Sequence, residues 1–425
     1  MYELTSLIKS DMLKALGVTE PGAIAFAVSK AKSYASGELK HIDIILNSGM
    51  YKNAFTCGIP NSDNYGIIFA TALGYISGDY TYNLEALKNV TENDNLLAKK
   101  LVDNNMISTT LKSISSKIYI EVVLQTENDI VDLIIKDTHT NVVKIVVNNK
   151  EVLNIDTSSD EEDDDKKKLI HKYSLEQILD YVNTVPLDEI SFVKEAYDVN
   201  LELFQESLDS DKTTFSKKLY EMNGNKIISE NEKDSALLLC ASAIEARVIG
   251  LNKPAMSITG SGAHGIIATL PLYAVYKINK LSEEKLYRAT MLSYLVCTYI
   301  KEYSGKLSAF CGCGIASGTG MALAVTYLKG GTYKNLVYTL NNMTASITGM
   351  ICDGGNQGCT MKAVSACDTA FRSVYFAMNN VFIDKIHSII GRTAEETMRN
   401  IGLIASPGMT KTEETIIYIF KDKVS

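Results

Sequence analysis

Apolar residues change their spacing part-way along this chain, and the change limits the possible folds more than any other feature. Up to about residue 155, stretches with helical spacing alternate with short runs of β-branched residues. The helical stretches are 4–16, 23–36, 67–76 and 96–106, and the strand-like runs are 41–46, 117–124 and 129–136. We therefore expect an α+β fold here, with antiparallel strands. The polar segment DTHTN at 137–141 separates 129–136 from the β-branched run VVKIVV and predicts an antiparallel hairpin.

The second part of the chain has a different character. Residues 158–168, SSDEEDDDKKK, contain no apolar side chain and predict a solvated linker or exposed loop. Ser174 and Gln177 then form a capping-box pattern that predicts the start of a helix. From there to about Asn400 the spacing is helical, and a final β-like run at 414–420, ETIIYIF, predicts a return to a strand. These patterns suggest an N-terminal α+β domain over 1–155, a linker over 156–173 and a mostly helical domain over 174–425.

Composition excludes several classes of function. The 425 residues are enough for two domains with cores. The formal charge of -8 and the absence of a basic stripe argue against nucleic acid as a partner. The chain has no apolar run typical of a signal peptide or a membrane helix, so we expect a cytoplasmic protein without a membrane partner. Whether it forms a homo-oligomer stays open.

Four glycine-bearing turns precede apolar helical patterns. They are GVTEPGAIAFAV (17–28), GIPNSDNYGIIFATALG (58–74), SITGSGAHGIIATLPL (257–272) and DGGNQGCTMKAV (353–364). The start of a helix offers unpaired N–H groups and the positive end of the helix dipole, which together attract small anions. Such turns also serve simply as helix caps, so each is weak evidence alone.

The chain has eight cysteines, and five of them lie between Cys297 and Cys359. In a long chain expected in a reducing compartment, this clustering favours metal or redox chemistry over disulfides. Cys311 and Cys313 precede a glycine-rich helix, whereas Cys352 and Cys359 flank DGGNQG. Cys359 should lie at a helix start, where the dipole lowers the pKa of a thiol. The spacing leaves an iron–sulfur centre, zinc and unliganded thiols as alternatives. We interpret Cys57, Cys240, Cys297 and Cys367 as core residues.

Several ordered stretches are similar to one known family. They are LGVTEPGAIAFAVSKA, YKNAFTCGIPNS, ALGYISGD, ITGSGAHGIIATLP, YSGKLSAFCGCGIASGTGMALAV, TGMICDGGNQGCTMKAV and SPGMTKTEETII. Over nearly its whole length the chain resembles L-cysteine desulfidase-type proteins, whose second half is similar to the alpha chain of iron–sulfur L-serine dehydratases. The resemblance implies a helical catalytic second domain and α,β-elimination on L-cysteine or L-serine.

The same resemblance implies a [4Fe-4S] cluster with one iron left open for the substrate. Its ligands would be Cys311, Cys352 and Cys359, with Cys313 as the alternative first ligand. We expect a small amino acid to bind beside this centre. Its candidate contacts are Thr19, Lys52, Asn53, Ser261, Gly262 and Asn356.

The chain departs from the family pattern at two positions. Family members typically read GCTEP where this chain reads GVTEP, so Val18 replaces a cysteine proposed as the catalytic base. The loop that usually reads GSGNQG is GSGAHG here, which introduces His264. The candidate bases are then His264, Glu20 and Lys306.

Two other functions remain compatible with the sequence. A paralogue without turnover could bind a small amino acid, since valine cannot accept a proton. A pyridoxal-phosphate β-eliminase could use the turn ITGSGAHG as a phosphate cradle and a lysine for the Schiff base.

Overall fold

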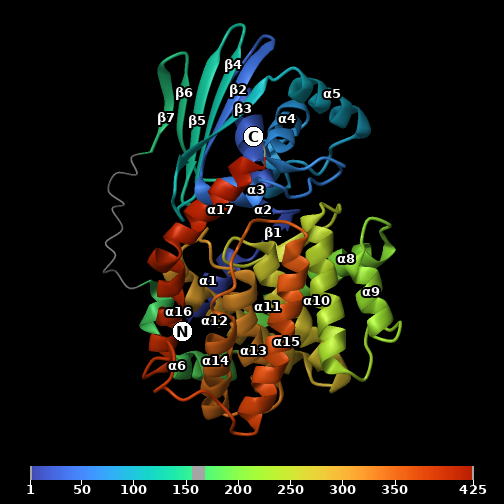
Figure 1. Cartoon of the computed structure of the whole chain (residues 1–425), viewed down its shortest axis with the longest axis vertical. Coiled ribbons are helices and arrows are strands. Elements are labelled where there is room, and N and C mark those ends of the chain that lie inside the picture. Colours follow the sequence, from blue (N-terminus) through green and yellow to red (C-terminus); the bar gives the residue numbers. More distant parts are fainter. Residues whose placement is uncertain (1, 156–167, 424–425) are drawn as a thin grey trace.

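The computed structural model describes residues 2–155 and 168–423. Within these residues the chain forms a sheet lobe and a mostly helical lobe, stacked along the long axis of the molecule (Figure 1). The linker predicted at 158–168 lies outside the described residues except for Lys168. The domain limits 1–155, 156–173 and 174–425 stay a prediction. No helix among the described residues has both the length and the apolar character that crossing a membrane requires.

The larger sheet of the described residues has the strand order β3-β2-β4-β5-β6-β7. Only β2 and β3 pair in parallel, whereas every other neighbouring pair in this sheet is antiparallel. A second sheet pairs β1 with β8 and so ties the N-terminal segment to the helical lobe. The strands are β1 (Leu13–Leu16), β2 (Leu39–Asn47), β3 (Ile107–Ser113), β4 (Tyr119–Thr126), β5 (Ile130–Lys136), β6 (Val142–Val147), β7 (Lys150–Asn154) and β8 (Pro254–Ser257).

Alternate side chains of the sheet form the core of the sheet lobe. On β4 and β5, Val122 lies opposite Leu133 and Leu124 lies opposite Val131, and all four are buried. This alternation is the period-two pattern of a sheet with one buried face. The hairpin predicted around 137–141 is confirmed, because β5 and β6 pair on either side of it.

Helix α2 (Thr19–Lys32) runs between the two lobes (Figure 1). Residues 19–29 are buried without a break, so the helix has no solvent-facing side along most of its length. A helix that is apolar all round is stable only inside a protein. It contacts β4, β5 and α4 (Gly66–Ile76) of the sheet lobe, whereas Val18, just before it, belongs to the core of the helical lobe.

The helical lobe is built around α10, α11, α12, α13 and α15, in which α10 and α13 both pack against α11 and α15, and α12 packs against α11 and α13. The N-terminal helix α1 also packs here, against α12. Short 3-10 or π-helical turns cover Tyr80–Glu85, Leu169–Lys172, Ser191–Val193, Cys313–Ser317 and Ile404–Gly408. The remaining helices are α1 (Tyr2–Asp11), α3 (Ser48–Ala54), α5 (Glu92–Asp103), α6 (Leu175–Thr184), α7 (Leu187–Ile190), α8 (Lys194–Asp209), α9 (Phe215–Met222), α10 (Glu232–Val248), α11 (Gly262–Ile278), α12 (Glu283–Ser304), α13 (Gly318–Leu328), α14 (Tyr333–Ile347), α15 (Gly358–Met378), α16 (Ala394–Leu403) and α17 (Thr410–Asp422).

Local signals at helix starts are confirmed. Ser174 and Gln177 form the predicted capping box at the start of α6. Each of the four glycine-bearing turns is followed by a helix, namely α2, α4, α11 and α15. The mostly helical character of the second part is confirmed as well.

Two predictions of secondary structure are wrong. The helix expected over 4–16 ends at Asp11, and Leu13–Leu16 instead pairs with β8, a partner some 240 residues away that local spacing could not reveal. The strand expected over 414–420 is helix α17. Its buried residues Glu413, Ile416, Ile417 and Phe420 follow helical spacing, which outweighs the β preference of isoleucine.

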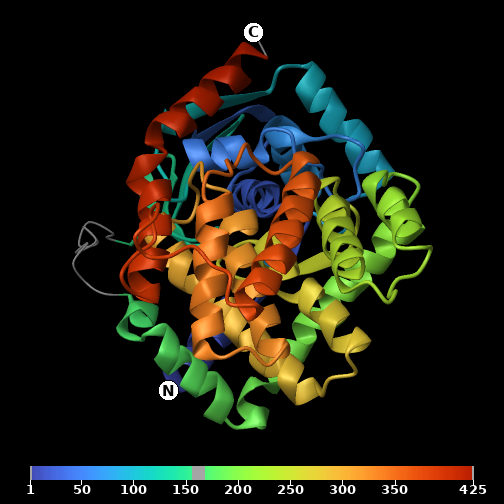
Figure 2. The same cartoon turned by 60° about the horizontal axis from the view of Figure 1, so that its bottom comes forward.

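The C-terminal helices run from the helical lobe along one side of the molecule to the sheet lobe (Figure 2). There α17 contacts α3, and Phe420 stacks on Phe55 with ring centroids 4.6 Å apart. The last helix therefore connects the two lobes beside their junction.

We predict that Leu133→Ala lowers the free energy of unfolding by about 2–5 kcal/mol, because it leaves a cavity in the sheet core. The matched control is Ile130→Ala on the same strand, where the side chain is 53% exposed and the expected loss is below about 1 kcal/mol. Urea unfolding followed by circular dichroism measures both variants. Equal losses would contradict the assignment of Leu133 to the core.

Candidate functional site

The candidate site lies where two loops of the helical lobe meet α2 and α3. The loop before α13 and the loop before α15 form an antiparallel bridge between Phe310 and Ile351. The N–H of Cys311 donates to the carbonyl of Met350 at 3.0 Å, and that of Cys352 donates to the carbonyl of Ala309 at 2.6 Å. This pairing brings together two cysteine-bearing segments that are about 40 residues apart in the sequence.

The thiols in these loops affect one another. Cys311 and Cys313 are hydrogen-bonded through their side chains, and the N–H of Gly314 lies 3.5 Å from Cys311 Sγ. Ionised Cys311, Cys352 and Cys359 would each raise the pKa of Cys313, and the bridge between Phe310 and Ile351 holds the loop of Cys311 beside that of Cys352. Cys359 is at the start of α15, as predicted, and its thiol donates to the carbonyl of Gly354 at 3.4 Å.

The thiols differ in how readily they ionise. The hydrogen bond from Cys313 lowers the pKa of Cys311 against the opposing effect of burial, with Lys362 also lowering it. Burial raises the pKa of Cys352 and raises that of Cys359 to about 12. The expectation that the helix start lowers the pKa of Cys359 is therefore wrong, because desolvation outweighs the dipole at this buried position.

The chemistry of these donors fits a thiophilic metal centre. Four sulfur atoms lie in a region that also holds Lys362, which would offset negative charge, and a buried thiolate needs such compensation. Within 2–155 and 168–423, however, no three histidine, cysteine or acidic side chains have the arrangement of a metal site. Cys57, Cys240, Cys297 and Cys367 are buried, as expected of core residues.

Two glycines allow the thiol-bearing loop to approach α3. Gly354 has φ +102°, and a Cβ there would lie 2.4 Å from the carbonyl oxygen of Lys52. A Cβ at Gly355 would lie 2.7 Å from Val18 Cγ1. Val18, the position at which the resemblance implies a cysteine, thus packs against the loop that carries Cys352 and Cys359.

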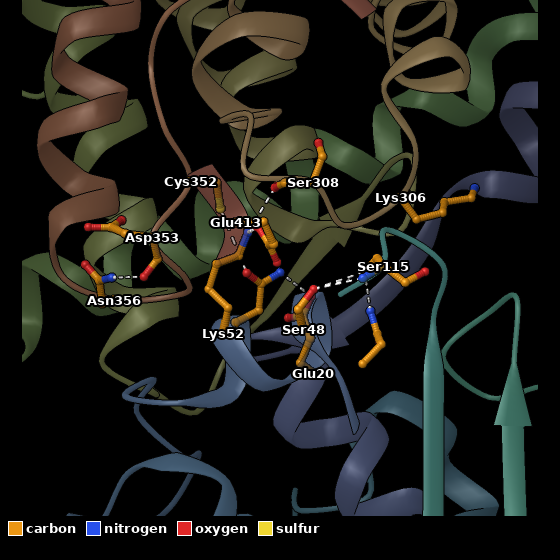
Figure 3. Close-up of polar contacts among 12 residues, drawn as sticks. Glu20, Ser48, Lys52, Ser115, Lys306, Ser308, Cys352, Asp353, Asn356 and Glu413 are labelled. Atoms are coloured by element: carbon orange, nitrogen blue, oxygen red, sulfur yellow. Dashed lines mark hydrogen bonds and ion pairs between the residues drawn. The ribbon is translucent and has the colours of Figure 1, made fainter. Parts of the chain in front are cut away.

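Lys52 forms a buried ion pair at this junction. Its side chain is fully buried, and Nζ lies 2.7 Å from Glu413 Oε2 and donates to the carbonyl of Ser308 at 3.0 Å. Figure 3 shows Lys52 pointing to Ser308 and Glu413, with Cys352 close by. The ammonium group therefore joins α3, the loop before Cys311 and the last helix. Its expected contact with a substrate stays a prediction, and Glu413 already occupies one side of it.

A second polar group surrounds Glu20 at the start of α2. Asn53 Nδ2 donates to Glu20 Oε1 at 2.8 Å, and Asn53 Oδ1 lies 3.8 Å from Cys352 Sγ. Arg247 Nη2 donates to Thr19 Oγ1 at 3.3 Å. Burial raises the pKa of Glu20, but His139, Asn53 and Arg247 outweigh it, so the pKa lies below its usual value and the carboxylate is ionised at neutral pH.

His264 lies against the turn between Cys311 and Cys313. Its Nδ1 is 2.5 Å from Thr259 Oγ1, and a Cβ at Gly312, between Cys311 and Cys313, would lie 2.6 Å from Nε2. Burial and the positive charges of Lys301 and Arg247 hold the pKa of His264 well below its usual value. The imidazole is therefore neutral, and it faces the turn that carries two of the thiols.

The remaining candidates are Lys306, Ser261, Gly262 and Asn356. Lys306 is exposed, and its charge acts on Asp11 and His264. Ser261 precedes α11 without capping it by its side chain, and Gly262 packs against Arg247. Asn356 Oδ1 accepts from the N–H of Gly358 at 2.8 Å, and Figure 3 shows Asn356 beside Asp353.

Sequence reasoning did not identify four residues of this region. They are His139, Arg247, Lys301 and Glu413. Each lies on a regular element or a hairpin turn, without a glycine motif beside it. Glu413 could have been identified from the sequence. It directly precedes the run at 414–420, and if that run is a helix, Glu413 lies on the same buried face as Ile416, Ile417 and Phe420.

Comparisons with known proteins agree with this architecture. A family model described as serine dehydratase alpha chain matches residues 81–418. A UPF0597 protein of Clostridium botulinum (strain Hall) is 40% identical over 424 residues, covering 98% of this chain and 97% of the relative. A UPF0597 protein of Caldanaerobacter subterraneus is 34% identical over 425 residues (99% and 98%), and one of Bacteroides fragilis is 35% identical over 424 residues (99% and 98%).

We predict that Lys52→Met lowers the free energy of unfolding by about 3–5 kcal/mol, because Glu413 is then left buried without its counter-charge. Adding Glu413→Leu should recover much of that loss. Lys411→Met is the control, because Lys411 pairs with Glu414 on the surface, where a pair contributes about 0–1 kcal/mol. Urea titration of the four proteins gives the comparison, and a double variant as unstable as Lys52→Met would contradict the coupling.

Proposed function

The chain belongs to the serine dehydratase alpha chain family, and we propose that it is a lyase that carries out α,β-elimination on a small L-amino acid. The observation that carries the proposal is the gathering of thiols beside an ionised Glu20 and a neutral His264 at the lobe junction. Such a site combines donors for a thiophilic centre with groups that bind a substrate and take up a proton.

In the proposed reaction the substrate loses its Cα proton and its β-substituent. The C–H electrons form the Cα=Cβ bond, and the β-substituent leaves as sulfide from L-cysteine or as water from L-serine. The resulting aminoacrylate tautomerises and is hydrolysed to pyruvate and ammonia. A cytoplasmic location would keep the thiols of the site reduced.

A [4Fe-4S] cluster held by Cys311, Cys352 and Cys359, with Cys313 as the alternative first ligand, would supply a Lewis acid for the leaving group. The isolated bridge between Phe310 and Ile351 supports this ligand set, because Cys311 and Cys352 each directly follow one of its two residues.

His264 is the proposed proton acceptor. Thr259 orients its Nδ1, and Gly312 leaves its Nε2 room at the turn between Cys311 and Cys313. Glu20 lies beyond Asn53 and is better placed to bind the substrate than to reach the same proton, although it remains a candidate base. Lys306 is exposed and is the third candidate. Ser261, Gly262, Thr19 and Asn356 stay predicted contacts of the substrate.

One observation favours a second function. Val18 packs against Gly355 in the cysteine loop, so an apolar side chain faces the region where the family pattern places a base. A binding protein for a small amino acid without turnover would keep the pocket and lack the reaction. A pyridoxal-phosphate enzyme would instead give a borohydride-reducible lysine adduct, which mass spectrometry of the reduced protein detects.

We predict that Cys352→Ala loses most of its iron and acid-labile sulfide after anaerobic purification or reconstitution, because one ligand of the centre is missing. Cys57→Ala is the control, since that thiol is buried in the core and donates to the carbonyl of Ala54. It should keep the iron content of the original protein. Full iron in Cys352→Ala would contradict the ligand assignment, and circular dichroism verifies that both variants are folded.

We predict that the reconstituted protein releases pyruvate from L-cysteine or L-serine, and that His264→Asn lowers kcat by about 100-fold or more, as expected for loss of a general base. His387→Asn changes an exposed histidine and should leave kcat unchanged. Coupled assays for pyruvate and sulfide measure the rates. No turnover from a protein with a full cluster would overturn the lyase proposal and favour the binding protein.

A further inference from the structure

The turn between β5 and β6 sends one side chain into the junction of the lobes. Within DTHTN, Asp137 and Thr138 are exposed, whereas His139 is only 7% exposed. The His139 ring passes beside Gly260, where a Cβ would lie 3.6 Å from its Cε1. The sheet lobe thus contacts the turn before α11 through a buried histidine at the tip of a hairpin.

His139 faces the carboxylate of Glu20 at ion-pair distance but does not form a hydrogen bond with it. Its Nε2 lies 3.8 Å from Glu20 Oε1, which is too long for a hydrogen bond. Among the described residues, this buried Nε2 has no hydrogen-bond partner. Leaving such a buried polar atom unpaired destabilises the folded state. An apolar side chain in this place would avoid that cost, so the position is explained better by a ligand than by stability.

The two facing groups suit a cationic donor. The Glu20 carboxylate accepts hydrogen bonds, and an imidazole accepts one at Nε2 when its Nδ1 carries the proton. Two acceptors 3.8 Å apart can both be reached by one nitrogen that lies about 2.8 Å from each. An ammonium group has three N–H donors and the charge that complements Glu20. Arg247, held by Thr19 close to Glu20, provides the opposite charge for a carboxylate on the same ligand.

This pair is also connected to the thiols. Asn53 donates to Glu20 through Nδ2, and its Oδ1 faces Cys352 Sγ. A single carboxamide, that of Asn53, therefore lies between Glu20 and the Cys352 sulfur. That spacing suits an α-amino acid, in which only a few bonds lie between the ammonium nitrogen and the β-substituent.

We propose that His139 and Glu20 together form the receptor for the α-ammonium group of the amino-acid ligand, so that the sheet lobe supplies one wall of the site. The ligand class rests on the proposed function, whereas the receptor itself requires binding and not turnover. In this arrangement the hairpin tip positions the substrate, and the helical lobe holds the thiols and His264.

The test compares ligands with and without the ammonium group, using calorimetric titration of the full-length protein. L-Serine is paired with 3-hydroxypropionate, and L-cysteine with 3-mercaptopropionate. The original protein should bind the amino acid of at least one pair more tightly. His139→Ala should weaken the binding of that amino acid by about 10-fold to 100-fold, the range of a charge-assisted hydrogen bond. It should change the affinity for the matched ligand without an ammonium group by less than about twofold.

Two variants complete the design. Thr138→Ala alters an exposed side chain of the same turn and should leave both affinities unchanged. His139→Gln keeps an acceptor oxygen and should restore part of the affinity for the amino acid, and it serves as the test if His139→Ala fails to fold.

The outcomes separate the hypotheses. If His139→Ala weakened the binding of both ligands equally, the role of His139 would be packing, and the receptor proposal would be overturned. Unchanged binding of the amino acid would overturn the proposal as well. An original protein that does not prefer the amino acid in either pair overturns it too. Selective weakening without any pyruvate or sulfide release would support the receptor and overturn the lyase.

Discussion

The buried Lys52 ammonium is the interaction on which the arrangement of the lobe junction depends. The Lys52 side chain has no exposed surface, so water cannot take over its interactions. Its ammonium group pairs with Glu413 of the last helix and donates a hydrogen bond to the carbonyl of Ser308. The next residue along the chain, Asn53, continues from this anchor to Glu20 and Cys352. Charge pairing thus sets where the loop before Cys311, α3 and α17 meet, and the polar groups of the site follow from that meeting.

The site divides into two regions that Asn53 connects. One region holds the four thiols with Lys362 and His264, and it suits an electron-poor centre. The other holds Glu20, Arg247 and His139, and it suits a zwitterionic ligand. Burial raises the pKa of Cys359 to about 12. The hydrogen bond from Cys313 instead lowers the pKa of Cys311, so Cys311 ionises more readily than Cys359.

Much of the fold could be predicted from local patterns. Alternation identified β2, β4, β5 and the hairpin to β6, and the capping pattern at Ser174 identified the start of α6. Prediction failed where a distant partner decided the outcome. Leu13–Leu16 forms a strand because β8 is beside it, and 414–420 is helical because α3 and Phe55 receive its apolar face. For the site, the cysteines and the glycine turns were visible, whereas His139 and Arg247 had no local signal.

By itself, the sequence determined which reactive groups the chain carries and their local settings. It showed which thiols lie near glycine-bearing turns, where helices start beside them, and that Val18 cannot act as a base. Those features are local, since they depend on residue type and on neighbours within a few positions. Only the tertiary structure decided which groups meet. Lys52 with Glu413, and His139 with Glu20, are pairs of residues far apart in the chain, and the packing of the two lobes at their junction sets the distances within each pair.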